Sequence, residues 1–301
     1  MDIYLANPRG FCAGVRRAID IVQKALQEYG APIYVRHEIV HNKHVVENLK
    51  NQGVIFIEDI AEADKNRPLV FSAHGVAEDV KKQALEMGLN IIDATCPLVL
   101  YVHKCIKKLE KDNAEIIVLG KKSHAEIIGT VGQVKNTNRV HIVANLSEAR
   151  NLNFSENVKI GLVTQTTLST DETKEITDFL KQKYPQIVLY NNICFATTNR
   201  QKAVKKLAEK TENILVIGSK NSSNSNKLKE VALSCGIKNA MLIDDVSEIN
   251  RDVSDSFDKI GITAGASAPE YLIEELIKEF EKRYDNINIH NVIVAEENID
   301  F

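Results

Sequence analysis

Short apolar runs alternate with amphipathic helical patterns along the whole chain. Six runs are almost continuously apolar, which is typical of strands buried on both faces of a parallel sheet. They span Pro32–Arg36, Pro68–Ser72, Glu115–Leu119, Lys159–Thr164, Ile214–Gly218 and Lys259–Thr263. The helical patterns between the runs supply the crossovers that parallel strands require. The alternation therefore predicts an α/β fold with mainly parallel sheets.

Three further apolar runs each lead to a cysteine and then to a helical pattern. The runs Ile3–Ala6, Asn90–Asp93 and Ile187–Tyr190 precede Cys12, Cys96 and Cys194, and the helical patterns Val15–Leu26, Leu98–Leu109 and Asn199–Ala208 follow. Each segment then repeats a polar loop at His41, His124 or Ser222, and a later one at His74, Thr166 or Ser267. A repeat of about 90 residues is too long for a solenoid. It predicts three homologous lobes.

We expect pseudo-threefold-related α/β lobes, each with one cysteine, around a central cavity. The predicted bounds are 1–88, 89–185 and 186–285, with a C-terminal extension, 286–301, that packs back on the first lobe. Ligands of open parallel sheets collect beyond the carboxyl ends of the strands. The polar loops all follow predicted strands, so we expect them to line the cavity.

The composition of the chain argues against a nucleic-acid-binding, membrane or exported protein. The chain has 301 residues, 44% of them hydrophobic, and a net charge of −3, which argues against a nucleic-acid or anionic-membrane surface. No apolar run approaches the roughly 20 residues of a membrane span. The first residues lack the basic and apolar regions of a signal peptide. Five cysteines are an odd count for a disulfide framework, so we expect a cytoplasmic protein.

The three equivalent cysteines are candidate metal ligands. Each stands at the start of a predicted helix, where the helix dipole favours the thiolate form, and Pro97 fits the first helical turn after Cys96. Three thiolates could hold zinc with a histidine as fourth ligand, or an iron–sulfur cubane with one iron open to substrate. Taken singly, each could instead be a structural thiol. Cys105 and Cys235 have no counterparts in the other lobes and are interpreted as structural.

The polar loops carry neutral or weakly basic hydrogen-bonding side chains at helix starts, a pattern that suits a phosphate or diphosphate. These residues are His41, His74, His124, Thr166, Ser222, Ser223, Asn224 and Ser267. The alternative is helix capping, and Ser267–Glu270 does match a capping box. Capping does not explain the histidines, which are poor caps. Glu126, two residues after His124, is either a buried general acid or a first-turn carboxylate that faces the helix dipole.

Two other motifs are rejected. Residues 37–41 match the H-E-x-x-H pattern of zinc proteases, but they continue a predicted strand, and the helical pattern begins only after Asn42. No G-x-G-x-x-G sequence occurs, so there is no dinucleotide fingerprint.

Long ordered strings of the sequence resemble the 4-hydroxy-3-methylbut-2-enyl diphosphate reductase family. They cover Ala6–Val15, Phe71–Gly75, Asp93–Pro97, Thr164–Thr167, Cys194–Arg200, Gly218–Asn226 and Thr263–Pro269. The resemblance runs from the first residue to the end of the third lobe. It implies an oxidoreductase for the last step of non-mevalonate isoprene biosynthesis, which makes isopentenyl and dimethylallyl diphosphates from an allylic alcohol diphosphate.

The resemblance also implies a cofactor and roles for individual residues. A [4Fe–4S] cluster would be held by Cys12, Cys96 and Cys194. The proton-delivering acid would be Glu126, with Thr166 beside it. Diphosphate contacts would come from His41, His74, His124, Ser222, Ser223, Asn224 and Ser267. Around the acid, the family commonly reads Gly-His-x-Gly-His-Pro-Glu, whereas residues 120–126 read Gly-Lys-Lys-Ser-His-Ala-Glu.

Electrons would have to come from a partner protein such as ferredoxin or flavodoxin, because no flavin or nicotinamide site is evident. Two other functions remain open from the residues. One is a non-redox hydro-lyase in which an open iron polarises a hydroxyl group, and the other is a non-catalytic zinc or ligand-binding scaffold. A reductase requires an external reductant, whereas a hydro-lyase does not. A protein that is colourless and holds zinc would favour the scaffold.

Overall fold

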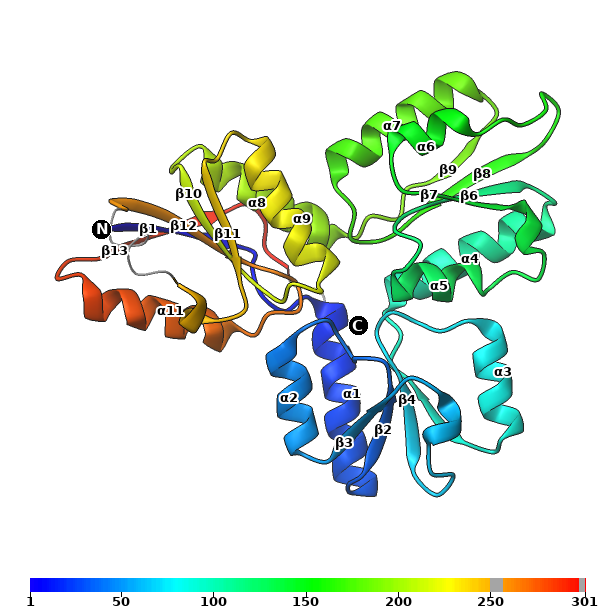
Figure 1. Ribbon diagram of the computed structural model, residues 1–301, viewed down its shortest axis with the longest axis horizontal. Coiled ribbons are helices and arrows are strands. Elements are labelled where there is room, and N and C mark those ends of the chain that lie inside the picture. Colours follow the sequence, from blue (N-terminus) through cyan, green and yellow to red (C-terminus); the bar gives the residue numbers. More distant parts are fainter. Residues whose placement is uncertain (250–256, 298–300) are drawn as a thin grey trace. The chain divides into compact units, whose positions relative to one another are not determined.

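The computed structural model describes residues 1–249, 257–297 and 301, and its strands form three parallel sheets with helices between them (Figure 1). The predicted α/β fold with three parallel-sheet lobes is confirmed. Residues 298–300 of the predicted C-terminal extension lie outside the described part of the chain.

Sheet B and sheet C share one strand order. Sheet B has the order β3-β2-β4-β5, and sheet C has the order β7-β6-β8-β9. The strands of sheet B are β2 (Ile33–Arg36), β3 (Val54–Ile57), β4 (Pro68–Phe71) and β5 (Asn90–Asp93). Those of sheet C are β6 (Glu115–Leu119), β7 (Val140–Val143), β8 (Ile160–Thr164) and β9 (Val188–Tyr190).

Sheet A repeats this order with one strand more, β11-β10-β12-β1-β13. Its strands are β1 (Asp2–Asn7), β10 (Asn213–Ile217), β11 (Asn239–Ile243), β12 (Lys259–Ala264) and β13 (Asn288–Ile293). Strand β1 pairs in parallel with β12 on one side and with β13 on the other. It thus holds the place that β5 and β9 hold in the other two sheets.

Helices connect the strands, as parallel pairing requires. They are α1 (Ala13–Tyr29), α2 (Lys43–Asn51), α3 (Glu78–Glu86), α4 (Pro97–Lys111), α5 (Ala125–Val131), α6 (Leu146–Asn151), α7 (Thr170–Lys183), α8 (Phe195–Ala208), α9 (Ser223–Ser234) and α11 (Glu270–Arg283). Short 3-10 turns lie at η1 (Ile60–Glu62), η2 (Thr137–Arg139) and η3 (Val246–Glu248).

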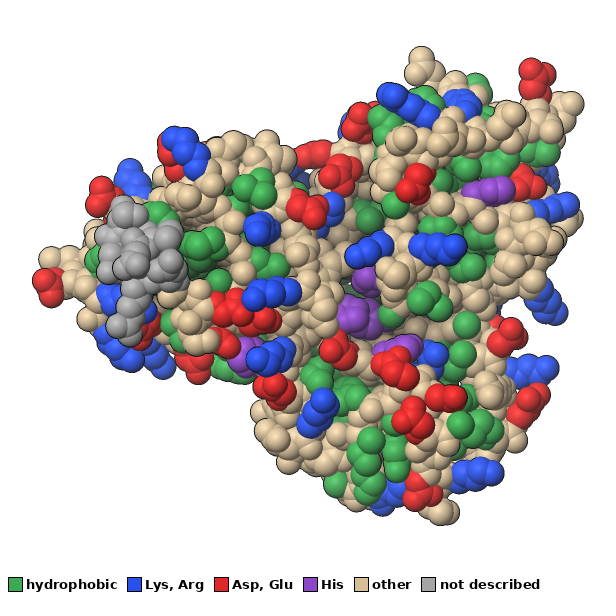
Figure 2. Space-filling view, viewed as in Figure 1, with side chains coloured by type: hydrophobic (Ala, Val, Ile, Leu, Met, Phe, Trp, Pro, Cys, Tyr) green, Lys and Arg blue, Asp and Glu red, His purple; other side chains and the backbone are tan. Residues whose placement is uncertain are grey.

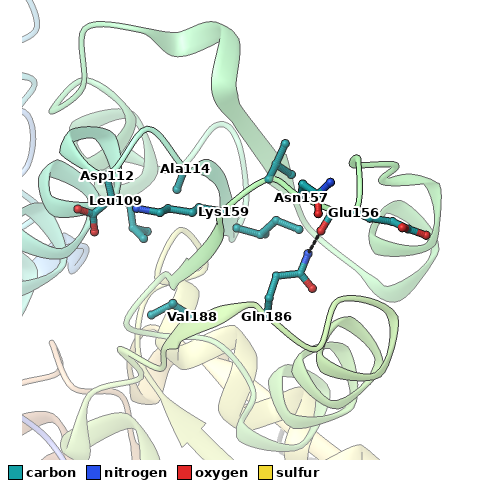
Figure 3. A pocket seen from close by; sticks show the side chains of 10 residues that line it. Leu109, Asp112, Ala114, Glu156, Asn157, Lys159, Gln186 and Val188 are labelled. Atoms are coloured by element: carbon teal, nitrogen blue, oxygen red, sulfur yellow. Dashed lines mark hydrogen bonds between the residues drawn. The ribbon is translucent and has the colours of Figure 1, made fainter.

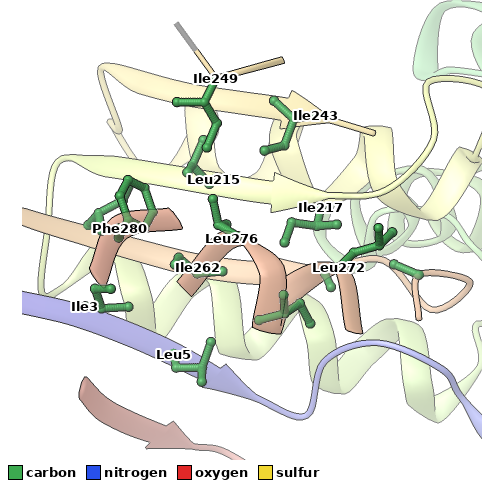
Figure 4. Packing of buried hydrophobic residues seen from close by; sticks show 14 of the residues in the cluster. Ile3, Leu5, Leu215, Ile217, Ile243, Ile249, Ile262, Leu272, Leu276 and Phe280 are labelled. Atoms are coloured by element: carbon green, nitrogen blue, oxygen red, sulfur yellow. The ribbon is translucent and has the colours of Figure 1, made fainter. Parts of the chain in front are cut away.

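Alternating side chains bury both faces of sheet A. On one face, Ile3 and Leu5 of β1 join Ile262 and the apolar side of α11, where Leu276 and Phe280 are fully buried (Figure 4). On the other face, residues of β1 and β10 pack against α8 and α9. Each such aliphatic or aromatic side chain contributes about 1.5–3 kcal/mol when it leaves water. Sheet C is built in the same way, with α4 and α5 on one face and α6 and α7 on the other.

The strand pairing differs from the predicted lobes in one consistent respect. We expected each cysteine-bearing strand to open its own lobe, but β5 pairs with β4, and β9 pairs with β8. The reason is the βαβ unit, because β4-α3-β5 and β8-α7-β9 each return a parallel strand beside the one before it. Strand β1 likewise joins the sheet of the third predicted lobe, and β13 pairs with it there. The sheets therefore end after the cysteine-bearing strands, not before them.

The chain divides into two compact units. One comprises Met1–Arg16, His41–Glu47 and Phe195–Asp300, and it contains sheet A. The other comprises Arg17–Val40, Asn48–Cys194 and Phe301, and it contains sheets B and C.

An ion pair between buried Arg200 and partly buried Glu297 connects the C-terminal segment to the rest of sheet A's unit. The Arg200 side chain on α8 is 1% exposed, and its Nη1 lies 3.0 Å from a carboxylate oxygen of Glu297. Its Nη2 donates to the carbonyl of Gly10 at 2.7 Å, in the loop that leads to Cys12. One guanidinium thus joins three segments that are distant in sequence.

Glu297→Ala should destabilise this unit strongly, because it leaves the Arg200 cation buried without its carboxylate. Breaking a buried pair in this way costs about 3–5 kcal/mol of unfolding free energy. Urea titration followed by circular dichroism measures the loss. The control is Glu209→Ala. It removes the exposed carboxylate that pairs with Lys206, another residue of α8. Equal effects of the two substitutions would show that the Arg200 pair has no special weight in stability.

Candidate functional site

All the polar residues singled out in the sequence follow the carboxyl end of a parallel strand. His74 follows β4, Thr166 follows β8 and Ser267 follows β12. His124, Glu126 and the serines of 222–223 come after the central strands β6 and β10 in the same way. Carboxyl ends of parallel strands lie at one edge of each sheet and form the usual ligand side of an α/β fold. Within each unit, the predicted residues are therefore at the edge where ligands bind.

Cys12, Cys96 and Cys194 share one local geometry. Each is partly exposed and directly precedes a helix, at α1, α4 and α8 respectively. Each backbone N–H donates at 3.0 Å to the carbonyl of a polar loop: Ala266 for Cys12, Ala73 for Cys96 and Thr166 for Cys194. The accepting loops are those that carry Ser267, His74 and Thr166. The three cysteines, which are equivalent in the sequence repeat, therefore also make equivalent backbone hydrogen bonds.

The other two cysteines differ from these three. Cys105 is buried in the middle of α4, where burial raises the pKa of its thiol. Cys235 is exposed and caps the C-terminus of α9. Among the described residues, no disulfide forms and no three His, Cys, Asp or Glu side chains are arranged to hold a metal ion. The three ligands and the cluster consequently remain a prediction, although thiolate donors at helix starts fit an iron–sulfur centre chemically.

Glu126 is a buried carboxyl group held by a single neighbour. It lies in the first turn of α5 and is 3% exposed. The backbone N–H of Thr166 donates to its Oε1 at 2.7 Å, and the Thr166 hydroxyl donates to its Oε2 at 2.8 Å. Burial raises the pKa of Glu126 from 4.5 to about 7, although the two Thr166 bonds oppose that rise. Near neutral pH this group can hold a proton and release it, as a general acid must.

Two histidines, one from the loop after β4 and one at the start of α5, are in ring contact. The rings of His74 and His124 lie edge to face with centroids 5.9 Å apart. His124 is the N-cap of α5, and its Nδ1 accepts from the N–H of Glu126 at 3.2 Å. The expectation that capping does not explain the histidines is therefore wrong for His124.

The serine and asparagine residues around α9 include one unsatisfied amide. Ser222 is the N-cap of α9 and accepts from the N–H of Ser225. Asn224, 5% exposed, has no hydrogen-bond partner for either Oδ1 or Nδ2 among the described residues. Buried amides are rarely left unsatisfied in a native protein, so this one is suited to receive a polar ligand.

Ser267 does not cap a helix. The N-cap of α11 is Pro269, which makes no side-chain cap bond, while the Ser267 hydroxyl donates to the carbonyl of His41 at 2.9 Å. Helix α11 begins at Glu270, too late for a Ser267 capping box. This bond joins two of the predicted ligand loops within the unit of sheet A.

Three residues near these loops were not singled out from the sequence. Asn42 and Thr263 each bury a polar atom without a partner in the described chain, Nδ2 and Oγ1 respectively. Asn42 directly follows His41, and Thr263 is the first residue of the string Thr263–Pro269, and these positions were the only available signal. His103 packs against the His74 loop: a Cβ on Gly75, which has φ +78°, would lie 2.8 Å from the His103 Cε1. Burial lowers the pKa of His103 to about 4, so the ring is neutral.

The H-E-x-x-H match is not a zinc-protease helix. Residues 37–42 are not helical, His37 has φ 60°, and α2 begins at Lys43. The predicted rejection of that motif is confirmed.

A pocket of about 310 Å³ opens at the opposite edge of sheet C (Figure 3). It is lined by Leu109, Asp112, Ala114, Glu156, Asn157, Val158, Lys159, Ile160, Gln186 and Val188. Its lining residues surround the amino ends of β6, β8 and β9, and none is a predicted site residue. The Gln186 amide spans part of it by donating to the carbonyl of Glu156 at 3.3 Å.

Acidic and basic side chains are interspersed on the surface that Figure 2 displays. Among the described residues, none of the helices has the length and apolar character needed to span a membrane.

Comparison with known proteins gives consistent matches along the chain. The sequence profile of the LytB protein family matches residues 3–281. A "4-hydroxy-3-methylbut-2-enyl diphosphate reductase" of Vesicomyosocius okutanii is 50% identical over 279 residues, which cover 92% of this chain and 90% of that protein. The protein of the same name from Neisseria gonorrhoeae (strain NCCP11945) is 50% identical over 277 residues, 91% of this chain and 85% of the relative.

Two solved structures are similar as well. The E-1-hydroxy-2-methyl-but-2-enyl-4-diphosphate reductase from Plasmodium falciparum superposes with a TM-score of 0.94 at 39% identity, over 98% of this chain and 93% of that one. A structure described as (E)-4-hydroxy-3-methyl-but-2-enyl diphosphate reductase, the terminal enzyme of the non-mevalonate pathway, has a TM-score of 0.66 at 31% identity. It covers 93% of this chain and 99% of its own.

Proposed function

The chain belongs to the LytB protein family, and from this premise we propose that it is the reductase of the last step of the non-mevalonate isoprenoid pathway. The substrate is (E)-4-hydroxy-3-methylbut-2-enyl diphosphate. Two electrons and two protons enter, the allylic C–O bond breaks, and one water leaves. The products are isopentenyl and dimethylallyl diphosphates, which differ in the carbon that takes the second proton.

The proposed cofactor is a [4Fe–4S] cluster with Cys12, Cys96 and Cys194 as its protein ligands. When bound, such a cluster supplies electrons one at a time and offers an iron without a protein ligand to the substrate hydroxyl. Support comes from the shared geometry of the three cysteines, each at a helix start with its N–H held by a polar loop.

Glu126 is the structural observation that carries this proposal. The departing hydroxyl must take a proton to leave as water, and a carboxyl group with a pKa of about 7 still carries a proton in neutral solution. Thr166 holds both carboxyl oxygens, so the group has a fixed orientation. Burial excludes bulk water that could otherwise protonate the substrate unselectively.

We assign the diphosphate to the neutral and weakly basic loop residues. They are His41, His74, His124, Ser222, Ser223, Asn224 and Ser267. Neutral donors at helix starts can bind phosphoryl oxygens without an arginine clamp. Asn224 favours this assignment most directly, because its buried amide has both polar atoms without a protein partner in the described chain.

His41→Ala or His74→Ala should weaken the binding of isopentenyl diphosphate far more than that of the corresponding alcohol. A hydrogen bond to a charged group contributes about 1.5–3 kcal/mol, so the dissociation constant should rise about tenfold to a hundredfold for the diphosphate. Isothermal titration with the cluster-loaded protein measures both ligands. Equal losses for the two ligands would rule out a phosphate role. The matched control is His141→Ala, whose ring bonds Glu115 on sheet C.

Asn224→Ala gives this assignment a second, independent test. The Asn224 amide has no protein partner among the described residues, so its removal should weaken diphosphate binding while leaving thermal stability unchanged. Asn226→Ala on the same helix should behave differently, because its amide donates to the carbonyls of Lys220 and Ser222 and anchors the loop. A loss of stability in Asn224→Ala with unchanged diphosphate affinity would make Asn224 a structural residue.

The proposed reaction is tested with the anaerobically purified protein. Incubation with substrate and dithionite-reduced methyl viologen should oxidise two viologen radicals for each molecule of isopentenyl or dimethylallyl diphosphate formed. Conversion without any reductant would instead indicate a hydro-lyase. A colourless protein that contains zinc and converts nothing would indicate a non-catalytic scaffold.

A further inference from the structure

The reaction consumes electrons, and two elements that run into predicted cluster ligands present a distinctive surface. Helix α4 starts immediately after Cys96, and edge strand β9 leads to Cys194. Both elements lie in the unit of sheets B and C. Within that unit, Tyr190 on β9 packs against the core cluster that contains Val102 and Cys105 of α4, so the two elements are neighbours. We call their outer side the α4–β9 face, defined by Leu100, Tyr101, Lys104, Lys108, Val188 and Tyr190.

The helix side of this face combines apolar and basic groups. Leu100, Lys104 and Lys108 are spaced four residues apart and share one side of α4, whose opposite side is buried against sheet C. Leu100 is 38% exposed, Tyr101 is 54% exposed, and Val188 on β9 is 49% exposed. Leu100 and Tyr101 are neighbours near the start of α4, and Val188 lies beside Leu109 near its end, so the exposed apolar groups extend along the face. Contiguous exposed apolar patches mark interaction surfaces.

The two lysines are not neutralised within the described part of the chain. Neither Lys104 nor Lys108 forms an ion pair there, whereas Lys107, one position away, is paired with Glu78 at 2.6 Å. Glu110, the nearest carboxylate along the helix, accepts from the N–H groups of Lys135 and Asn136. Positive charge is therefore available to an acidic partner along α4, about two helical turns from Cys96 at Lys104 and about three at Lys108.

Distance to the predicted cluster favours an electron carrier as that partner. The N–H of Leu100 donates to the Cys96 carbonyl at 3.0 Å, so Leu100 is one helical turn from a ligand. Electron transfer slows steeply with distance, which makes a surface one turn from a ligand an effective entry point. Transient redox complexes bury less than about 1,200 Å² and rely on charge complementarity, which a small mixed face can provide.

We propose that the α4–β9 face docks a small acidic one-electron carrier of the ferredoxin class and admits its electrons towards Cys96 and Cys194. This inference rests on the proposed reductase function. Lys104 and Lys108 steer the acidic carrier, while Leu100, Tyr101 and Val188 form the contact. The carrier passes one electron per encounter, is itself oxidised by one electron, and two encounters complete a turnover.

The test compares two double variants with equal changes in charge. Lys104→Glu with Lys108→Glu reverses the charge of the proposed face. The control, Lys181→Glu with Lys278→Glu, reverses two exposed lysines, one on α7 across sheet C and one on α11 of the other unit. Each is assayed with a reduced plant-type [2Fe–2S] ferredoxin and with dithionite-reduced methyl viologen. Viologen is a small cation that needs no docking surface, and a more acidic protein would not repel it.

Steering by surface charge changes association rates by about 10- to 1,000-fold, so the face variant should lose about tenfold or more in kcat/KM for ferredoxin at low salt. The loss should appear mainly in KM and should shrink as ionic strength rises. Viologen-driven turnover and iron content should stay at wild-type levels in both variants. Unchanged ferredoxin kinetics in the face variant, or equal losses in the control, would overturn the docking proposal. A wild-type protein inactive with viologen would overturn the proposed function instead.

Discussion

Replacement of Cys12, Cys96 or Cys194 singly by serine is expected to abolish both the iron–sulfur cluster and the reductase activity. A cubane normally has four thiolate ligands, and one that is already held by three cannot lose another without becoming labile. The measurement is iron and acid-labile sulfide per chain in anaerobically purified protein, together with its visible spectrum. Turnover with reduced viologen should fall to background in all three variants. Iron content gives a result that does not depend on activity.

The same chain provides matched controls for this prediction. Cys105→Ser changes a buried thiol on the helix that Cys96 precedes, and Cys235→Ser changes an exposed one. Both proteins should keep their iron. If Cys105→Ser lost iron as severely as Cys96→Ser, the assignment of one ligand to each repeat would be wrong. If all five variants kept iron, the cluster would have to be held by other residues.

The main strands were predictable because buried parallel strands are almost continuously apolar. The predicted runs Glu115–Leu119 and Asn90–Asp93 coincide with β6 and β5, and the other runs differ from observed strands by one residue at one or both ends. Strands β3, β7 and β11 were not predicted from the sequence. Each is the outermost strand of its sheet on the side away from the cysteine strand. Two of them keep an apolar run, since β3 reads Val-Ile-Phe-Ile and β11 contains Ala-Met-Leu-Ile, whereas β7 is interrupted by His141. Such short apolar runs do not by themselves distinguish a strand from part of a buried helix.

Sheet membership was harder to predict than the strands themselves. The boundary between two sequence repeats can be assigned at any equivalent position. The sequence therefore does not indicate whether a strand pairs with the segment before it or with the segment after it. Strand β1 illustrates this, because its partners β12 and β13 are more than 250 residues away in sequence. Only long-range backbone pairing decides the question.

The candidate site was predictable in its residue types and less so in its contacts. Loops after strands were identified correctly, since strand ends and polar residues are both visible in the sequence. The His124 cap on α5 and the Ser267 bond to His41 depend on where each helix begins, and helix boundaries are the least certain feature of a sequence-based prediction. The unsatisfied amide of Asn224 could not be inferred, because burial and the absence of partners are properties of the folded chain.

Glu126→Gln should leave the cluster in place and slow the chemical step by about 10²- to 10⁴-fold, the usual contribution of one positioned acid. Glutamine keeps the shape of the side chain and can still accept from Thr166, but it cannot donate a proton as an acid. Iron content and substrate affinity should therefore persist. The fall should be seen in single-turnover measurements with saturating substrate and reductant.

The acid–base behaviour of Glu126 adds a pH dependence. Wild-type turnover should decline as pH rises through about 7, because the carboxyl group then loses the proton that it must deliver. Stability should respond in the same range. The folded protein binds a proton more tightly at Glu126 than the unfolded chain does, so this contribution to stability is full below pH 4.5 and is lost as pH rises through about 7. Glu126→Gln should remove that slope.

The two pH profiles together separate a catalytic Glu126 from a structural one. A merely structural carboxyl group would change the stability profile on replacement by glutamine and leave the turnover rate nearly intact. A catalytic one would change both, with the rate falling at every pH and its dependence on pH near 7 disappearing. Near-normal turnover in Glu126→Gln with an intact cluster would remove this residue from the mechanism. The proton on the departing hydroxyl would then have to come from the substrate's own diphosphate or from a bound water.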